Sequence, residues 1–516
     1  MKRLLSLLLV FLLACPAALL AACDNGTASG AAAYAHLDRS GLFGIDEPIL
    51  ESRTYTYDPN TGEYDHTVEN FNLEATAYLA GAIGAKSMRF RIPARLMTDS
   101  ENYDQTMLNY MKRAATLLNE NGVTHLIGML EVFPKSTGFI PDSSYSVPDQ
   151  NDPYYDDWMN AVYLQTKTIC SLFPEITMWE MGNEPNSAVF FHPNGYEGNE
   201  GTLTPGSGGF EWDELVAIYT DYMYYMAKGI HEANPDNIAF TGGYAFPNAV
   251  LGDYDSIQWF IEDTYTQIKE GRAPSNVPED ERSTDVRDYF DGLSWHPYAN
   301  NNVGVTEEWL NGNNQIYSAA IANGDEGIPV IFTEFGFHDD GDEAKEIKQI
   351  GYMEQAFEYM QNDMPYVVAC CAFRMYQCQY AVSWGGTAQN YWGYFTEDLD
   401  GSGVYPRQKA IELQKLYGGT GDLYKYARGI VLFDSNGGTN VASQTVSLNG
   451  KVVEPAQPVR PADSFREYVF DGWYYGDKKW DFDNDTVTEK TMTLVAKWHV
   501  SGEYTEEFLP EDIEKR

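Results

Sequence analysis

Short apolar runs alternate with longer amphipathic segments between about residues 36 and 420. The segments 102–121, 211–234 and 343–361 place apolar residues three and four positions apart, which is typical of helices with one buried face. The short runs are typical of buried strands, and they are 42–45, 87–92, 125–130, 177–181, 238–242, 292–295, 330–334 and 367–373. Strands that alternate with helices in this way define the α/β class and favour a closed (β/α)8 TIM barrel. The alternation is clear, whereas the number eight depends on where the runs are divided.

The pattern changes after the glycine-rich stretch 418–428. From there the chain has short alternating segments and turns, and 430–433, 441–448 and 493–498 are predicted strands. We expect a separate β-rich domain at 428–500, followed by a charged tail at 501–516.

The N-terminal residues have the features of a targeting segment. Lys2 and Arg3 precede an apolar stretch, which ends in Leu20-Ala21-Ala22-Cys23. This ending resembles the lipobox of bacterial lipoproteins, which implies cleavage of a signal peptide at 1–22 and lipid attachment to Cys23. An ordinary secretory signal is the alternative. Residues 23–35 are rich in small side chains and are predicted to be a flexible tether. The lipoprotein interpretation places the protein on the extracellular face of a bacterial cell membrane, held there by lipid alone.

Composition limits the possible partners. The formal net charge is −42, and such a surface repels nucleic acid but is compatible with an uncharged ligand. Aromatic residues make up 14% of the chain, and they serve either as core or as platforms on which sugar rings stack. Cys170, Cys370, Cys371 and Cys378 form neither a disulfide framework nor a zinc motif, because no CxxC pair or histidine cluster accompanies them. We therefore expect no zinc site, and the chemistry that the two glutamates below suggest requires no metal and no organic cofactor.

Two glutamates carry the candidate chemistry. Glu184 follows the fourth predicted strand and Glu334 ends the seventh. In a barrel both side chains would lie at the rim where enzymes of this fold keep their catalytic groups. Two carboxyl groups about 5–5.5 Å apart are what retaining glycoside hydrolysis requires.

The sequence around these glutamates resembles the clan A (β/α)8 glycoside hydrolases. The resemblance rests on Asn183-Glu184-Pro185 and on Thr333-Glu334-Phe335-Gly336, and its wording is nearest to family 39 and its relatives. Family 5 fits less well, because Glu131 follows the third predicted strand where that family usually has a histidine. The resemblance implies a retaining enzyme for a β-linked glycan, with Glu184 as acid/base and Glu334 as nucleophile. It also implies that Asn183 binds the 2-hydroxyl of the sugar.

Further positions fit the same resemblance. It implies that His296 and Tyr298 lie near the nucleophile, and that Trp384 stacks on the sugar beside a closing loop at 391–395. An arginine on the second strand is also implied, and Arg89 or Arg91 can supply it; both point to one face of the strand, and we favour Arg89. A Tyr298 hydroxyl that donates to Glu334 would favour the ionised carboxylate, whereas Glu184, between apolar surface and a second carboxylate, should keep its proton longer.

The C-terminal segment resembles the Listeria–Bacteroides repeat, also known as the internalin-type B repeat. Three pieces carry this resemblance, at 433–439, 470–474 and 493–498. It implies a small β-grasp-like domain of bacterial surface proteins, with a cell-surface or glycan partner and no chemistry of its own. The alternative for the whole chain is an inactive carbohydrate-binding or adhesion lipoprotein. The sequence leaves the glycan, its linkage, exo or endo action and the oligomeric state open.

Overall fold

The computed structural model describes most of the chain. The described residues are 30–47, 54–58, 63–67, 73–135, 137–196, 209–246, 254–377, 391–397, 403–462 and 466–503. The predicted signal peptide, Cys23, Cys378 and Trp384 lie outside them.

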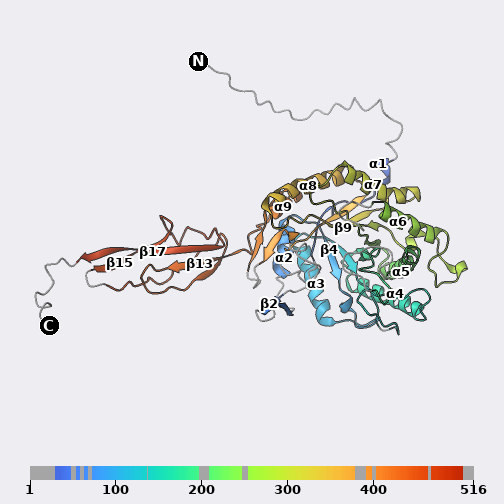
Figure 1. Ribbon diagram of the computed structural model, residues 1–516, viewed down its shortest axis with the longest axis horizontal. Helices are drawn as coiled ribbons and strands as arrows, with labels where there is room; N and C mark the ends of the chain where they lie inside the picture. The colour runs from blue at the N-terminus through green and yellow to red at the C-terminus, as the bar shows by residue number, and fades with distance from the viewer. Residues whose placement is uncertain are drawn as a thin grey trace, which may run out of the picture.

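Eight parallel strands form a barrel, as the sequence predicts (Figure 1). Their hydrogen-bonded order is β7-β6-β5-β4-β1-β10-β9-β8, and the bridges Phe240–Gly292 and Tyr244–Trp295 join β7 to β8 and complete the ring. The strands are β1 (Phe43–Asp46), β4 (Ser87–Ile92), β5 (His125–Leu130), β6 (Met178–Asn183), β7 (Ile238–Gly243), β8 (Leu293–Ser294), β9 (Val330–Phe335) and β10 (Val367–Phe373). Each of the eight predicted barrel strands is therefore present; three have the predicted bounds, and the ends of the others differ by at most two residues.

Helices connect successive strands and cover the outside of the barrel (Figure 1). Polar side chains cap the N-termini of several helices by accepting hydrogen bonds from backbone N–H groups. Asp104 accepts from Met107 N, Thr306 from Trp309 N, and Asp342 from Ala344 N and Lys345 N. The long helices are α2 (Leu73–Ala82), α3 (Gln105–Glu120), α4 (Tyr155–Leu172), α5 (Trp212–Ala233), α6 (Tyr254–Lys269), α7 (Glu307–Ala322), α8 (Glu343–Asn362) and α9 (Gln408–Tyr417). None of the helices in the described part of the chain combines the length and apolarity needed to cross a bilayer.

Smaller elements extend this framework. The sequence pattern did not predict the hairpin of β2 (Thr54–Asp58) and β3 (Glu63–Thr67), nor the pair β11 (Phe395–Glu397) and β12 (Val404–Pro406). A short helix, α1 (Gly30–Ala33), falls within the predicted tether, and the next residue, Tyr34, packs against Tyr317 with ring centroids 6.2 Å apart. The end of the tether segment is therefore ordered against the barrel domain.

The barrel interior is layered. Apolar side chains fill one layer, among them Ile127, Phe240 and Ile331. The next inward-facing residue of β9 is Thr333, which hydrogen-bonds the buried carboxylate of Glu180. Because strands run toward the catalytic rim of such a barrel, this polar layer lies between the apolar interior and the rim residues. It forms the floor of the candidate site.

The C-terminal residues form a separate five-stranded sheet (Figure 1). Its order is β14-β13-β17-β15-β16, with β13 parallel to β17. The strands are β13 (Arg428–Asp434), β14 (Gln444–Ser447), β15 (Arg466–Tyr475), β16 (Lys478–Lys479) and β17 (Thr491–Glu503). A cluster that includes Val431, Phe433, Trp473 and Leu494 is its own core. The sheet is thus an independent packing unit beside the barrel.

Candidate active site

The barrel rim brings Glu184 and Glu334 together. Glu184 directly follows β6, and Glu334 is the fifth residue of β9. One carboxylate oxygen of each lies within 4.8 Å of the other and of a ring nitrogen of His296. This separation is close to the spacing expected for a pair of retaining carboxylates.

The backbone turns sharply at Glu184 to place this side chain. Glu184 has φ 46°, a left-handed conformation that few non-glycine residues adopt. Its amide donates to Gly243 O at 3.1 Å, and Asn186 closes the turn by exchanging two hydrogen bonds of 2.7 and 2.8 Å with the backbone of Ala245. The motif Asn-Glu-Pro-Asn therefore supplies both the carboxylate and the contacts that hold its turn against the end of β7.

Three donors converge on the Glu334 carboxylate. Its Oε1 accepts from Arg89 Nη1 and from Arg91 Nη2, the latter at 3.0 Å, and its Oε2 accepts from the Tyr298 hydroxyl at 2.9 Å. Burial alone would raise the pKa of Glu334, but the electrostatic influence of His296, Arg89 and Arg91 and the Tyr298 hydrogen bond outweigh it and lower this pKa to about 2. Both arginines that the sequence left as alternatives thus contact the same carboxylate.

Arg89 links this carboxylate to the floor of the site. The guanidinium is fully buried, and besides Glu334 it donates from Nε to Glu180 at 2.7 Å and from Nη2 to Asn183 Oδ1 at 2.8 Å. Glu180 also accepts from the Thr333 hydroxyl at 2.5 Å. Glu180 was not predicted as a site residue, although a carboxylate inside a buried strand indicates a buried partner.

His296 bonds the other glutamate. Its Nδ1 lies 2.9 Å from Glu184 Oε1 and 3.8 Å from the nearer oxygen of Glu334, and its Nε2 lies 3.1 Å from the Thr333 hydroxyl. The ring is therefore close to the predicted nucleophile, Glu334, as well as to Glu184. Its hydrogen bond is to Glu184, because the ring stands between Thr333 and the end of β6.

Asp46 is a further buried carboxylate beside this cluster. It ends β1, in register with Arg89 on β4, and none of the residues that the structure describes gives its oxygens a hydrogen bond. Burial raises the pKa of Asp46 to about 7, although the charges of Arg91 and Arg89 oppose the rise. Its position at the end of the first strand was the available signal in the sequence, but no motif marks it.

Trp392 supplies an aromatic wall at the described rim. Its ring centroid lies 5.3 Å from that of Tyr298 and 5.5 Å from that of Phe373. It belongs to the segment predicted as a closing loop, whereas Trp384, the residue predicted to stack on sugar, lies outside the described residues. Trp392 is therefore the tryptophan that the structure places next to the Tyr298–Glu334 pair.

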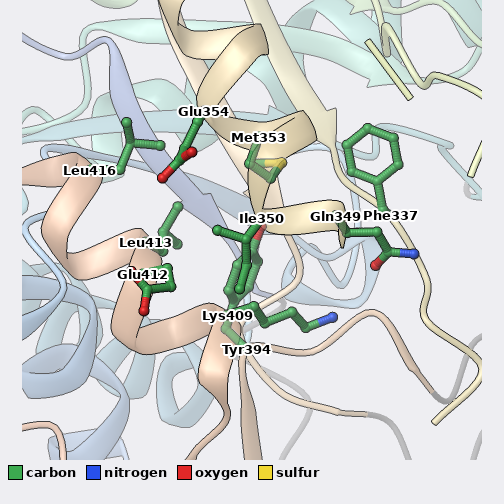
Figure 2. A pocket seen from close by; sticks show the side chains of 10 residues that line it. All are labelled: Phe337, Gln349, Ile350, Met353, Glu354, Tyr394, Lys409, Glu412, Leu413 and Leu416. Carbon is green, nitrogen blue, oxygen red and sulfur yellow. The ribbon is translucent and has the colours of Figure 1, made fainter. Parts of the chain in front are cut away.

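A buried ionic cluster holds the backbone on both sides of Trp392. Arg407 donates to Gly393 O at 2.9 Å, and Lys409 donates to Tyr391 O at 3.1 Å. Both cations also bond the fully buried carboxylate of Asp339, each at 2.9 Å. Lys409 reaches this cluster from a pocket between α8 and α9 that Figure 2 shows, whose wall includes Met353 and Leu413. Most residues that line the pocket belong to α8 and α9, on the outside of the barrel.

The electrostatics of the rim bear on metal binding. Glu184, His296 and Glu334 are close enough to act as ligands of one ion. However, Arg89 and Arg91 are both within hydrogen-bonding distance of Glu334 and already neutralise its charge. A divalent cation bound to Glu334 would be repelled by these two guanidinium groups. The donor set fits a pair of carboxylates, one bonded to two arginines and the other to a histidine, better than a metal centre.

Comparison with known proteins gives a family for the C-terminal domain. Residues 430–497 match the model of the Listeria-Bacteroides repeat domain, as the sequence predicts. Two proteins of Evansella cellulosilytica, named as a membrane protein and a Gly-rich membrane protein, are 37% and 36% identical over 81 and 74 residues. These matches cover 15% and 14% of this chain, and the chain spans only 11% and 8% of the relatives' length.

Solved structures similar to this chain include two that are titled as glycosidases and a third titled ZgEngAGH5_4. The β-glycosidase BGL167 is 14% identical with a TM-score of 0.46 and covers 74% of this chain and 97% of its own. A family 1 β-glucosidase from Thermotoga maritima is 14% identical with a TM-score of 0.47, covering 74% and 98%. The structure titled ZgEngAGH5_4 is 12% identical with a TM-score of 0.43, covering 73% and 96%.

Proposed function

We propose that the barrel is a retaining glycoside hydrolase that cleaves a β-linked glycan by double displacement. The observation that carries the proposal is the pair of facing carboxylates, Glu184 and Glu334, of which only Glu334 is bonded to two arginines. An environment that separates the protonation states of two neighbouring carboxyl groups assigns their roles as acid and nucleophile.

Glu334 has the environment of the nucleophile. Its pKa of about 2 keeps it ionised at neutral and mildly acidic pH, and Tyr298 fixes the orientation of its second oxygen. Because a guanidinium remains positive in proteins, Arg89 and Arg91 sustain this state whether His296 is charged or neutral. The carboxylate is thus held ready to attack an anomeric carbon.

Glu184 has the environment of the acid/base. Thr333 donates its hydroxyl proton to Glu180, so its oxygen is free to accept from Nε2–H of His296. When His296 is neutral in this tautomer, its Nδ1 lone pair faces Glu184 Oε1 at 2.9 Å and accepts a hydrogen bond from the protonated Glu184 carboxyl. This hydrogen-bond chain supports Glu184 as the group that protonates the leaving oxygen.

The reaction then follows in two steps. Glu334 attacks the anomeric carbon while Glu184 gives its proton to the glycosidic oxygen, which breaks the bond and leaves a glycosyl ester on Glu334. Glu184, now ionised, takes a proton from water, which attacks the ester carbon and frees both the sugar and Glu334. No metal or organic cofactor takes part in these steps.

Asn183 and Trp392 are the proposed sugar-binding groups. The Asn183 oxygen accepts from Arg89, which turns the amide nitrogen toward the rim as a donor for a sugar hydroxyl. Trp392 offers an aromatic face beside Tyr298 for the pyranose ring. The acidic chain, with a formal charge of −42, fits a neutral glycan.

We also propose that the protein acts at a bacterial cell surface. The lipobox-like residues 20–23 and the repeat domain at 430–497 support this location. The second candidate function, a carbohydrate-binding lipoprotein without turnover, shares this location and the same cleft. The ordered hydrogen bonds of both glutamates favour the enzyme.

Mutants of the two glutamates distinguish these functions. We would incubate the 24–516 chain with aryl β-glycosides and neutral β-linked polysaccharides, beside Glu184→Gln and Glu334→Gln, with exposed Glu308→Gln as the matched control. The enzyme proposal predicts turnover in the wild type and the control and a loss of at least about 1,000-fold in both site variants. Turnover that persists in Glu334→Gln would reject the assignment, and binding without turnover would favour the lipoprotein.

A further inference from the structure

Two exposed indoles lie on neighbouring helices of the barrel. Trp259, in the second turn of α6, is 55% exposed, and Trp212, the first residue of α5, is 38% exposed. The other tryptophans in the described ranges are buried or half-buried. Exposed tryptophans are unusual enough to indicate a binding role when two occur together.

Asp263 places the two indoles in one patch. Its Oδ2 accepts from the indole N–H of Trp212 at 2.8 Å, and it stands one helical turn after Trp259 on the same face of α6. The buried ring of Phe260 meets Trp212 edge-on, with centroids 5.5 Å apart and an interplanar angle of 84°. The Trp212 indole is thus fixed from two sides while part of its surface faces solvent.

The patch lies toward the catalytic rim. Helix α5 follows β6 and helix α6 follows β7, so both helices begin at the end of the barrel where Glu184 stands. Figure 1 shows α5 and α6 as neighbouring helices on the outer wall. Trp212 is at the start of its helix, and Trp259 is about 8 Å along α6.

We propose that Trp212, Trp259 and Asp263 form a surface site for a neutral polysaccharide chain, separate from the catalytic pair. Indole faces stack on the apolar face of pyranose rings, and a carboxylate accepts hydrogen bonds from the neighbouring hydroxyls. This inference rests on the proposed function for its choice of ligand. A chain bound here would be kept close to the mouth of the barrel between catalytic events, which raises its effective concentration there.

The chemistry of the patch favours a glycan over other occupants. Two ring faces supply far less area than the ~1,200 Å² that a stable protein–protein interface buries. The exposed Asp255 and the half-buried Glu262 and Asp263 make its surroundings acidic, which disfavours phosphate-bearing ligands and anionic lipid surfaces. A neutral polymer with stackable rings matches both features.

The test is native gel electrophoresis of the 24–516 chain through gels that contain barley β-glucan, xylan or glucomannan. We expect at least one polysaccharide to retard the wild type, and Trp259→Ala and Trp212→Ala to weaken that retardation at least about fivefold. Ile347→Ala on α8 is the matched control, because Ile347 is equally exposed at 55% and lies on a distant helix. Trp259→Phe should keep part of the affinity, and circular dichroism confirms that each variant is folded.

Activity gives an independent readout. In Trp259→Ala, kcat/KM on the retarding polysaccharide should fall at least about fivefold more than kcat/KM on an aryl glycoside. Retardation of the wild type by none of the three polysaccharides, or equal retardation of Trp259→Ala and wild type, overturns the inference. The catalytic proposal would fail on a different result, unaltered turnover in Glu334→Gln. Such a failure would not change what gel retardation says about the surface site.

Discussion

Charge at single residues decides the chemistry of the barrel rim. Glu334 shares one oxygen between Arg89 and Arg91, and Arg89 shares its guanidinium among Glu334, Glu180 and Asn183. Arg89 is fully buried within this network, so its removal would leave carboxylates buried without a counter-charge. Arg91 is partly exposed, with 23% of its side chain accessible, and is the residue with which the role of this positive charge can be tested.

Arg91→Gln should change the pH dependence of turnover. Loss of one positive charge favours the protonated form of Glu334, so its pKa rises and the acid limb of kcat/KM moves to higher pH. We expect kcat/KM near neutral pH to fall about tenfold, which corresponds to about 1.4 kcal/mol. The pH–rate profiles of wild type, Arg91→Gln and the exposed control Arg95→Gln measure this. An acid limb at the same pH in all three proteins would contradict the assigned role of Arg91.

The raised pKa of Asp46 predicts that the stability of the protein depends on pH. Its pKa is raised to about 7 in the folded protein and is about 3.9 in an unfolded chain, so between these values only the folded state keeps the proton. Stability therefore falls as pH rises from about 4 to about 7, and an asparagine at this position does not titrate. The Tm of Asp46→Asn relative to wild type should be higher at pH 8 than at pH 5. An equal difference at both pH values would show that Asp46 is ionised in the fold.

Site residues that belong to a sequence motif were predictable. Asn183, Glu184 and Glu334 are part of recognisable motifs, and the structure brings all three to one rim of the barrel. Asp46 and Glu180 were missed because the arginines whose charges act on them lie on another strand, and only the folded barrel brings those strands together. The expectation for His296 was only that it lies near the nucleophile, since the choice of its hydrogen-bond partner between carboxylates a few ångströms apart needs coordinates.

At the scale of elements, the loop that carries Trp392 depends on helix α9. Lys409 from this helix donates to Tyr391 O and to Asp339, and it is almost fully buried. Burial lowers the pKa of Lys409 to about 8, with the Arg407 charge acting in the same direction and Asp339 opposing both. The helix therefore positions a wall of the site through a charged group that does not itself reach the glutamates.

Lys409→Met should loosen this wall. Methionine keeps most of the side-chain volume but removes the bond to Tyr391 O, so Trp392 becomes less well ordered. We expect KM for an aryl glycoside to rise about three- to tenfold with a smaller change in kcat, because sugar binding suffers more than the carboxylate pair. Lys415→Met, on an exposed lysine of the same helix, is the control. Equal KM values in both variants would mean that the cluster has no part in positioning the wall.

The regular elements were predictable because their periodicity is strong. The barrel strands are continuous apolar runs and helices such as α3 have one clear buried face, so both patterns survive without tertiary information. The predicted 102–121 helix begins three residues later at Gln105, where Asp104 caps it. The β2–β3 hairpin was missed because its two strands contain no aliphatic residue, so no apolar run marks them in the sequence.

At the scale of the whole molecule, the barrel and the C-terminal sheet have separate cores. The barrel cluster ends at Leu423, and the sheet cluster begins at Val431. The chain between them is bonded to both parts, as Val404 N donates to Tyr426 O on the barrel side and Leu448 N donates to Ala427 O on the sheet side. Separate cores indicate that each part folds with its own cooperativity.

A fragment that ends at residue 427 tests this separation. It keeps the barrel core and the residues proposed to be catalytic, so we expect kcat/KM on an aryl glycoside to stay within about twofold of the full chain. The isolated 428–503 fragment should unfold cooperatively in urea as a control for its own stability. A barrel fragment that is folded but inactive would show that the sheet contributes to the site.

The stereochemical course of hydrolysis tests the central claim most directly. Proton NMR of the wild-type reaction with its best aryl β-glycoside shows which anomer of the sugar appears first, before mutarotation mixes the two. Double displacement through Glu334 predicts the β anomer first, because two inversions restore the original configuration. Appearance of the α anomer first would mean a single displacement by water, and it would contradict Glu334 as the nucleophile.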